Sequence, residues 1–149
     1  MTDQILLDNL DHANQIGAAA HVHYVPGVDR CISRIRDGRL LGGVIFQGYT
    51  GASIEVHMAG FDPHWITRDL IWATFAYAFI QLGCLKVIGR VAETNQRALE
   101  LDLKLGFIEE ARIRDAYPDG DLIILTMRRD ECRWLKIAPR SRFWEQPNG

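Results

Sequence analysis

Two side chains that can carry protons lie two positions apart in one short segment. Residues 53–59 read Ser-Ile-Glu-Val-His-Met-Ala, an alternation that predicts a β-strand with its apolar side chains on one face. Glu55 and His57 then share the opposite face with Ser53. Either group could accept a proton, directly or through a water molecule. An ordinary solvated strand face is the alternative, and the sequence leaves both interpretations open.

The other histidines and the cysteines form no pattern typical of a metal site. The only close histidine pair is the H-x-H of His21 and His23, which is a weak signal, and no two cysteines have C-x-x-C spacing. We therefore expect no metal and no disulfide framework. Reduced thiols suit a cytoplasmic protein of a bacterium or of a phage-infected host. The unpatterned residues are His12, His64, Cys31, Cys84 and Cys132.

The C-terminal tail is the one basic concentration in a chain whose net charge is −2. Interleaved arginines and aromatic rings could contact nucleic acid or an acidic partner. Acidic residues dilute this charge, so a solvated, partly packed tail or a homodimer contact is expected instead. The basic residues are Arg128, Arg129, Arg133, Lys136, Arg140 and Arg142, the aromatic ones are Trp134, Phe143 and Trp144, and the acidic ones are Asp130, Glu131 and Glu145.

Length and composition predict one globular domain over residues 1–149, with the basic and aromatic tail beginning at about residue 130. The chain is 48% hydrophobic and 24% charged, as in ordinary soluble domains. The most apolar run, residues 70–82, is too short to span a bilayer, so no membrane association is expected.

Periodicity and turn residues predict the elements that must position these side chains. A modest amphipathic helix is expected over residues 3–16, ending near Gly17, before a meander of three strands. An almost wholly apolar helix, a β-branched strand, a second helix and a final hairpin follow. The later elements are expected at residues 31–36, 40–47, 53–59, 66–82, 85–91, 95–105, 108–115 and 122–127.

This order predicts an α/β (α+β) fold. Its mixed central sheet should have a parallel pair of strands in the middle, because a strand–helix–strand unit spans residues 53–91. Helices should cover both faces of the sheet.

Two segments resemble a known family. In Gcn5-related N-acetyltransferases a long helix runs into the fifth strand, and residues 76–87 (AYAFIQLGCLKV) resemble that segment. Residues 91–107 resemble the end of that strand and the helix that follows it in the same family. Residues 112–129 are similar to the last hairpin of the ribosomal-protein-alanine acetyltransferase branch, and small phage proteins have this layout. The resemblance covers roughly residues 30–135. In that branch the second segment ends N-x-x-[AS]-…-[KR]-x-G-F, matched here by Asn95, Ala98, Lys104, Gly106 and Phe107.

The resemblance implies transfer of an acetyl group from acetyl-CoA to a primary amine. Splayed parallel strands would pair with the pantetheine arm, and the start of the long helix would hold the pyrophosphate. It also favours Glu55 over His57 as the base, because acidic bases occur on this strand in the family. The cofactor-binding residues that it implies are Met58, Ala59, Ile66, Thr67, Arg68 and Asn95. The side-chain amide of Asn95 is also expected to cap the helix that follows it.

The pyrophosphate loop departs from the family pattern, [QR]-x-x-G-x-[GA]. The aligned residues are D-P-H-W-I-T, so Asp62 stands at the basic or amide position, and Trp65 and Thr67 fill the two small ones. Arg68 could supply the positive charge.

The proton donor for the departing thiolate departs as well. The family often has a tyrosine on the second helix, and the matching position holds Asp102, which the sequence presents as an exposed surface residue. Tyr117, in the turn of the last hairpin, is the substitute to consider, and the role of a simple turn aromatic is the alternative.

Two alternatives to an active acetyltransferase follow from these departures. One is a catalytically inactive structural or virion-associated phage protein with the same fold. The other is a nucleic-acid-modifying member that grips its substrate with the arginine tail.

Overall fold

A single twisted sheet organises the chain, and the computed structural model describes residues 3–137. The sheet has seven strands in the order β1-β2-β3-β4-β5-β7-β6, and β4–β5 is its parallel pair. The strands are β1 (Asp3–Leu7), β2 (Arg30–Arg36), β3 (Arg39–Gln47), β4 (Ser53–Gly60), β5 (Lys86–Ala92), β6 (Ile108–Tyr117) and β7 (Gly120–Arg128).

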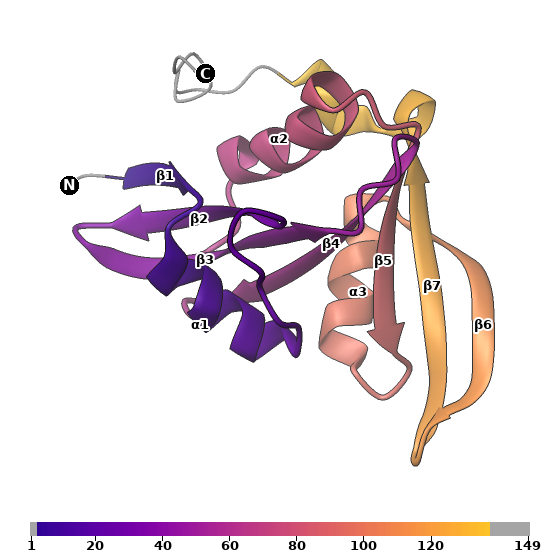
Figure 1. Ribbon diagram of the computed structural model, residues 1–149. Helices are drawn as coiled ribbons and strands as arrows, with labels where there is room; N and C mark the ends of the chain where they lie inside the picture. The colour runs from indigo at the N-terminus through magenta and orange to yellow at the C-terminus, as the bar shows by residue number, and fades with distance from the viewer. Residues whose placement is uncertain (1–2, 138–149) are drawn as a thin grey trace.

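Helices cover both faces of the sheet, which confirms the expected α/β (α+β) architecture. Figure 1 shows α2 on one side of β2–β4 and α1 on the other, while α3 lies beside β5. The α-helices are α1 (Leu10–Ala20), α2 (Arg68–Ala76) and α3 (Gln96–Leu105); short turns of other helix types are η1 (Tyr77–Gln81), η2 (Arg129–Glu131) and η3 (Arg133–Lys136).

Two cores form because strand side chains alternate between these faces. The larger core packs β-strand side chains such as Val44 and Val87 against α2 and α3, with Phe75 and Phe79 at its centre. The smaller core places Ile16 of α1 on the opposite face. We call these the α2/α3 face and the α1 face.

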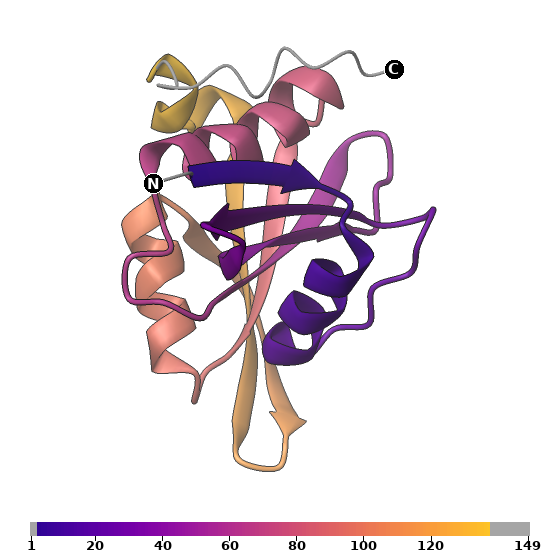
Figure 2. The same cartoon turned by 90° about the vertical axis from the view of Figure 1, so that its left-hand side faces the viewer.

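The first predicted element is wrong in type. The sequence predicts one helix over residues 3–16, whereas β1 pairs antiparallel with β2 and α1 begins only at Leu10. Asp8 separates the strand from the helix, because its backbone adopts a left-handed conformation with φ 52°. The Asn9 side chain then caps α1 by accepting a hydrogen bond from the His12 N–H. Figure 2 shows β1 completing the edge of the sheet before the chain turns into α1.

Gly17, expected to end that helix, lies inside it. A Cβ here would meet the Val22 carbonyl oxygen at 2.8 Å, so the glycine permits a close backbone approach. His21 ends α1 instead, in a left-handed conformation with φ 61°.

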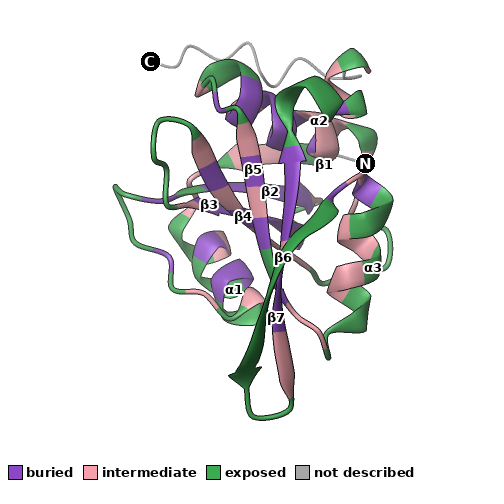
Figure 3. Cartoon of the chain, turned by 90° about the vertical axis from the view of Figure 1, so that its right-hand side faces the viewer, coloured by how far each residue is buried: buried purple, intermediate pink, exposed green. Residues whose placement is uncertain are grey.

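The remaining predicted elements are confirmed, with boundaries shifted by at most two residues when α2 and η1 are taken together. The long apolar helix starts at Arg68 and changes to π-helical geometry at Tyr77, where the Leu82 N–H reaches the Tyr77 carbonyl. Asn95 caps α3 by accepting from the Ala98 N–H, as expected. Figure 3 shows β6 exposed along its whole length at the far edge of the sheet.

Candidate active site

A cleft opens where the two parallel strands part. β4 and β5 pair only from Ser53–Lys86 to Glu55–Ile88, and no pair joins them beyond that point within residues 3–137. Figure 1 shows the two strands diverging from there. The cleft between them has a volume of about 500 Å³. Strand backbone between Val56 and Gly60 is therefore open toward β5.

Side chains from six places line this cleft. They come from β3, β4, β5, α3, the end of α1 and the end of β6 at the last hairpin turn. Predicted residues that the cleft brings together are Glu55, His57, Met58, Asn95 and Tyr117. Residues that the sequence did not assign to the site are His21, Gln47, Arg90 and Asp102.

Glu55 lies between two cationic or potentially cationic groups on the α1 face. Its Oε1 is 3.9 Å from His57 Nε2 and 3.8 Å from Arg90 Nη1. These distances are too long for hydrogen bonds, so the carboxylate keeps its lone pairs for another donor. The three side chains share a face because His57 and Arg90 follow Glu55 and Ile88 by two residues on their strands.

His57 is held neutral at physiological pH. Burial lowers the pKa of this imidazole, the Glu55 carboxylate partly opposes that effect, and the Arg90 guanidinium adds to it. A neutral imidazole can accept a proton, so His57 keeps the basic character that the sequence suggested.

Asp102 is a correction to the expected exposed surface residue. Its carboxyl is half-buried, lines the cleft and lies on the α2/α3 face, opposite Glu55. A Cβ added at Gly89 of β5 would be 3.5 Å from Asp102 Oδ2, an ordinary van der Waals contact, so the carboxyl lies directly over this strand. Burial raises its pKa to about 7. A large fraction of the carboxyl is therefore protonated at neutral pH and can donate a proton.

The expected phosphate-binding residues lie away from this cleft, around the loop of residues 61–67. Ile66 lines a small apolar hollow beneath α2, which Met58 borders as well as lining the cleft. Thr67 is the N-cap of α2, accepting from the Leu70 N–H, and Arg68 is exposed at the first helical position. Ala59, on β4, packs against the smaller core.

Asp62, the residue at the expected basic position, folds this loop onto itself. Its Oδ1 accepts from the His64 N–H at 2.8 Å, and its Oδ2 pairs with Arg39 at 3.1 Å. The His64 N–H and then Arg39 lower the pKa of this carboxyl. The Asp62 carboxylate is therefore already paired with a backbone N–H of the loop and with an arginine of β3.

Trp65 turns onto the sheet. Its indole covers two paired glycines, Gly42 of β3 and Gly60 of β4, and a Cβ at Gly60 would lie 2.1 Å from its Nε1. The loop has no glycine at the two small positions of the family pattern, but two glycines of the strands beneath it accommodate the indole ring.

Arg34 anchors the same loop from below. Its guanidinium is 2% exposed, forks onto both Asp3 oxygens at 3.0 and 3.1 Å, and donates to the His64 carbonyl. The start of α2 is thereby tied to two strands.

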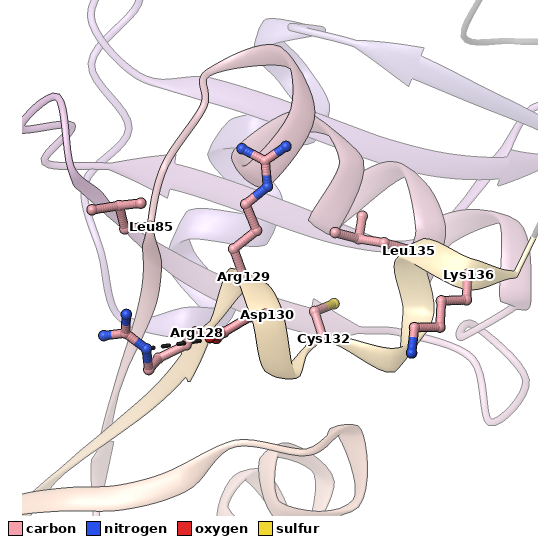
Figure 4. A pocket seen from close by; sticks show the side chains of 7 residues that line it. All are labelled: Leu85, Arg128, Arg129, Asp130, Cys132, Leu135 and Lys136. Carbon is pink, nitrogen blue, oxygen red and sulfur yellow. Dashed lines mark ion pairs between the residues drawn. The ribbon is translucent and has the colours of Figure 1, made fainter.

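A second pocket of about 420 Å³ lies at the opposite end of β5 and β7 (Figure 4). Arg128, Arg129 and Lys136 line it, and Arg128 pairs with Asp130 at 3.6 Å. Arg133 instead covers the Trp134 ring, so the described part of the basic tail is partly packed. The tail residues Arg140, Arg142, Phe143, Trp144 and Glu145 lie outside the described residues.

Residues 3–137 contain neither a group of side chains that could bind a metal ion nor a helix that could cross a membrane. No group of three His, Cys, Asp or Glu side chains there could hold a metal ion. No helix in that range is long and apolar enough to cross a bilayer.

Sequence comparison finds no family model and no curated protein that matches this chain. Solved structures do match. Mutant forms of the spermidine/spermine N-acetyltransferase SpeG from Vibrio cholerae superpose with a TM-score of 0.67 at 18% identity, over 87% of this chain and 96% of that one. A chimera of that Vibrio cholerae enzyme with hSSAT gives 0.66 at 18%, over 86% and 96%.

A probable acetyltransferase matches less completely, with a TM-score of 0.61 at 20% identity over 70% of this chain and 63% of that one. At these identities the likeness concerns the fold. Together with the parallel β4–β5 pair and the capped α3, it shows that this chain has the fold of the Gcn5-related N-acetyltransferases.

Proposed function

We propose that this protein transfers an acetyl group from acetyl-CoA to a primary amine. The observation that carries the proposal is the cleft opened by β4 and β5, which has a proton acceptor on one face and, on the other, a carboxyl whose pKa is about 7. Acyl transfer to an amine needs both groups, since the amine must lose a proton and the departing thiolate must gain one.

The cofactor lies along β4 toward α2. Its pantetheine amides pair with the open backbone near Met58 and Ala59, and the first N–H groups of α2 face the pyrophosphate with the positive end of the helix dipole. Arg68 adds a cation at this end. The inward turn of Trp65 supports the proposal, because its ring does not occupy the space beyond the helix start.

Glu55 is the proposed base. It receives a proton from the acceptor amine, whose nitrogen then attacks the thioester carbonyl carbon; the C–S bond breaks, and the acetyl group stays on nitrogen. Glu55 is favoured over His57 because the family resemblance places acidic bases on this strand, and its carboxylate accepts no hydrogen bond within the described residues. His57 is the second candidate.

Asp102 and Tyr117 are the two candidate acids for the departing thiolate. Asp102 is favoured, because it occupies the helix position at which the family often has a tyrosine and its pKa is about 7. Tyr117 lines the same cleft from the hairpin turn and is 41% exposed. Asn95 stays assigned to the cofactor arm as well as to the helix cap.

Calorimetric titration with acetyl-CoA tests the proposal directly. We expect saturable binding; absence of binding at millimolar cofactor would reject the enzyme and favour the structural or virion-associated alternative. Steeply salt-dependent DNA retention that is lost on removing residues 130–149 would instead favour the nucleic-acid-modifying alternative.

Replacement of the base tests the catalytic assignment. Glu55→Gln keeps the shape of the side chain but cannot take a proton, so turnover at neutral pH should fall about 100-fold or more while acetyl-CoA affinity is retained. His57→Gln is the matched variant. Unchanged turnover in Glu55→Gln with a large loss in His57→Gln would move the base to the imidazole.

The proposed cytoplasmic location and homodimer formation stay predictions. Sedimentation equilibrium of the purified protein measures the second of these.

A further inference from the structure

We infer that the acceptor is an amine that also carries a carboxylate, as a free amino acid does. This inference rests on the proposed acetyl transfer and on Glu55 being the group that the amine approaches. It is carried by Arg90, a side chain for which the transfer chemistry itself has no need.

Arg90 projects into the cleft with little to hold it. It lies on β5 two residues beyond the last β4–β5 pair, on the same face as Glu55. Its side chain is 52% exposed, and its one partner within residues 3–137 is the Glu55 carboxylate at 3.8 Å. A guanidinium has five N–H donors, so most of them are available to a ligand.

The remaining titratable groups around the cleft do not compensate this charge with extra acids. Burial keeps His57 neutral, and Asp102, with a pKa of about 7, is about half protonated at pH 7 and lies on the opposite face. The Asp29 carboxylate, whose charge reaches His57, already accepts hydrogen bonds from the Val25 N–H and the Gln47 amide. His21 is the other imidazole in the lining, and Tyr117 the only phenol. One carboxylate and one guanidinium therefore face the acceptor, side by side.

Adjacent opposite charges fit a ligand whose own opposite charges are adjacent. An amino acid can place its amine against Glu55 and its carboxylate against Arg90, whose planar fork suits bidentate recognition of a carboxylate. A polyamine meets the reverse situation. Its second ammonium would lie near Arg90 without a second acid to pair with it, and such unpaired like charges select against a ligand.

Matched acceptors test this directly in an assay of thiol release from acetyl-CoA. The pairs are L-amino acids and their amides, which keep the side chain and the amine but lose the negative charge; spermidine is a third arm. We expect kcat/KM to be about 10- to 100-fold higher for the acids, the worth of a hydrogen-bonded charge pair. The less basic amine of an amide works against this result, which makes the test stringent.

Arg90→Gln should remove the preference. It should raise KM for the amino acids about 10- to 100-fold and affect the amides much less, and Arg90→Lys should recover part of the loss. Arg129→Gln, at the opposite end of β5 and β7, is the control and should change neither.

Three results overturn the inference. Equal or better use of amides would point to polypeptide N-termini, preferred use of spermidine would point to polyamines, and an equal loss for acids and amides in Arg90→Gln would make Arg90 structural. In each of these the proposed acetyl transfer survives, because turnover is still seen. If acetyl-CoA neither binds nor turns over with any amine, the proposed function fails, and this inference fails with it.

Discussion

The cleft between β4 and β5 and the loop of residues 61–67 are built in opposite ways. In the cleft, Glu55 stands 3.8 and 3.9 Å from its neighbours, and Arg90 is half exposed. In the loop, Asp62 is hydrogen-bonded at 2.8 Å and Arg34 is buried beneath it. One region leaves its polar groups available, and the other uses them internally.

This difference indicates that the cleft is the region that binds a ligand and that the loop is the region that gives rigidity. Polar groups without close partners are costly unless a ligand or water completes them, so they mark a binding surface. The loop departs from the family pattern in its side chains, but its internal bonds hold the N-terminus of α2 in one place, which is what a backbone phosphate site requires.

Arg34→Ala should have the largest effect on the loop side of this comparison. It empties a buried side-chain site and leaves the His64 carbonyl without its donor, so the free energy of unfolding should fall by about 3 to 5 kcal/mol. Urea denaturation measures it. Arg36→Ala is the control. The Arg36 side chain is 36% exposed and pairs with the same Asp3 at 3.4 Å, so its removal should lower the free energy of unfolding by less than about 1 kcal/mol. Equal costs would contradict the anchoring role.

Asp102→Asn, in the cleft, should change how the free energy of unfolding depends on pH. The folded-state pKa of about 7 lies above the ordinary 3.8, so the folded protein holds an extra proton between these values and loses stability as pH rises through them. Asparagine does not titrate. The variant should match the wild type near pH 4 and exceed it above pH 7, by at most about 4 kcal/mol.

Chemical denaturation across this range measures the difference. A gap that does not change with pH would mean that Asp102 is ionised in the folded protein, and Tyr117 would then become the favoured acid.

Gly60→Ala should have the smallest effect and should sharpen the comparison. The new Cβ would lie 2.1 Å from the Trp65 indole, so the ring must move, at a cost of about 1 to 3 kcal/mol in unfolding free energy and with weaker acetyl-CoA binding. Trp65→Gly in the same chain removes the clash. The two changes should therefore be non-additive in a double-mutant cycle of urea unfolding, and additive costs would show that the ring and the glycine are independent.

Local pattern was a good guide where one face of an element is buried. The alternation of residues 53–59 placed Glu55 and His57 together, and the amide of Asn95 was correctly expected to cap α3. The N-terminal segment misled because Leu6, Leu10 and Ala13 fall at helical spacing by coincidence. Pairing of β1 with β2 overrides that spacing, and pairing is a long-range property.

Arg90 carried a signal that was passed over, since a lone arginine in the apolar run of residues 85–91 needs a polar outlet. Asp102 carried a signal as well, because it lies four residues after Ala98 and three before Leu105, on the apolar side of its helix. Its depth of burial depends on the packing of α3 against β5, where the carboxyl lies over Gly89.

The sequence by itself therefore determined the order of most elements, the face that Glu55 and His57 share, and the departures at Asp62, Trp65 and Thr67. Those are properties of neighbouring residues, because periodicity and turn chemistry act over a few positions. The tertiary structure alone decided that β4 and β5 part after Glu55, that Trp65 turns onto Gly42 and Gly60, and that Arg90 and Asp102 meet Glu55 across one cleft. Proton affinity and charge pairing depend on burial and on distances between residues far apart in the chain, which only the packed sheet and its helices set.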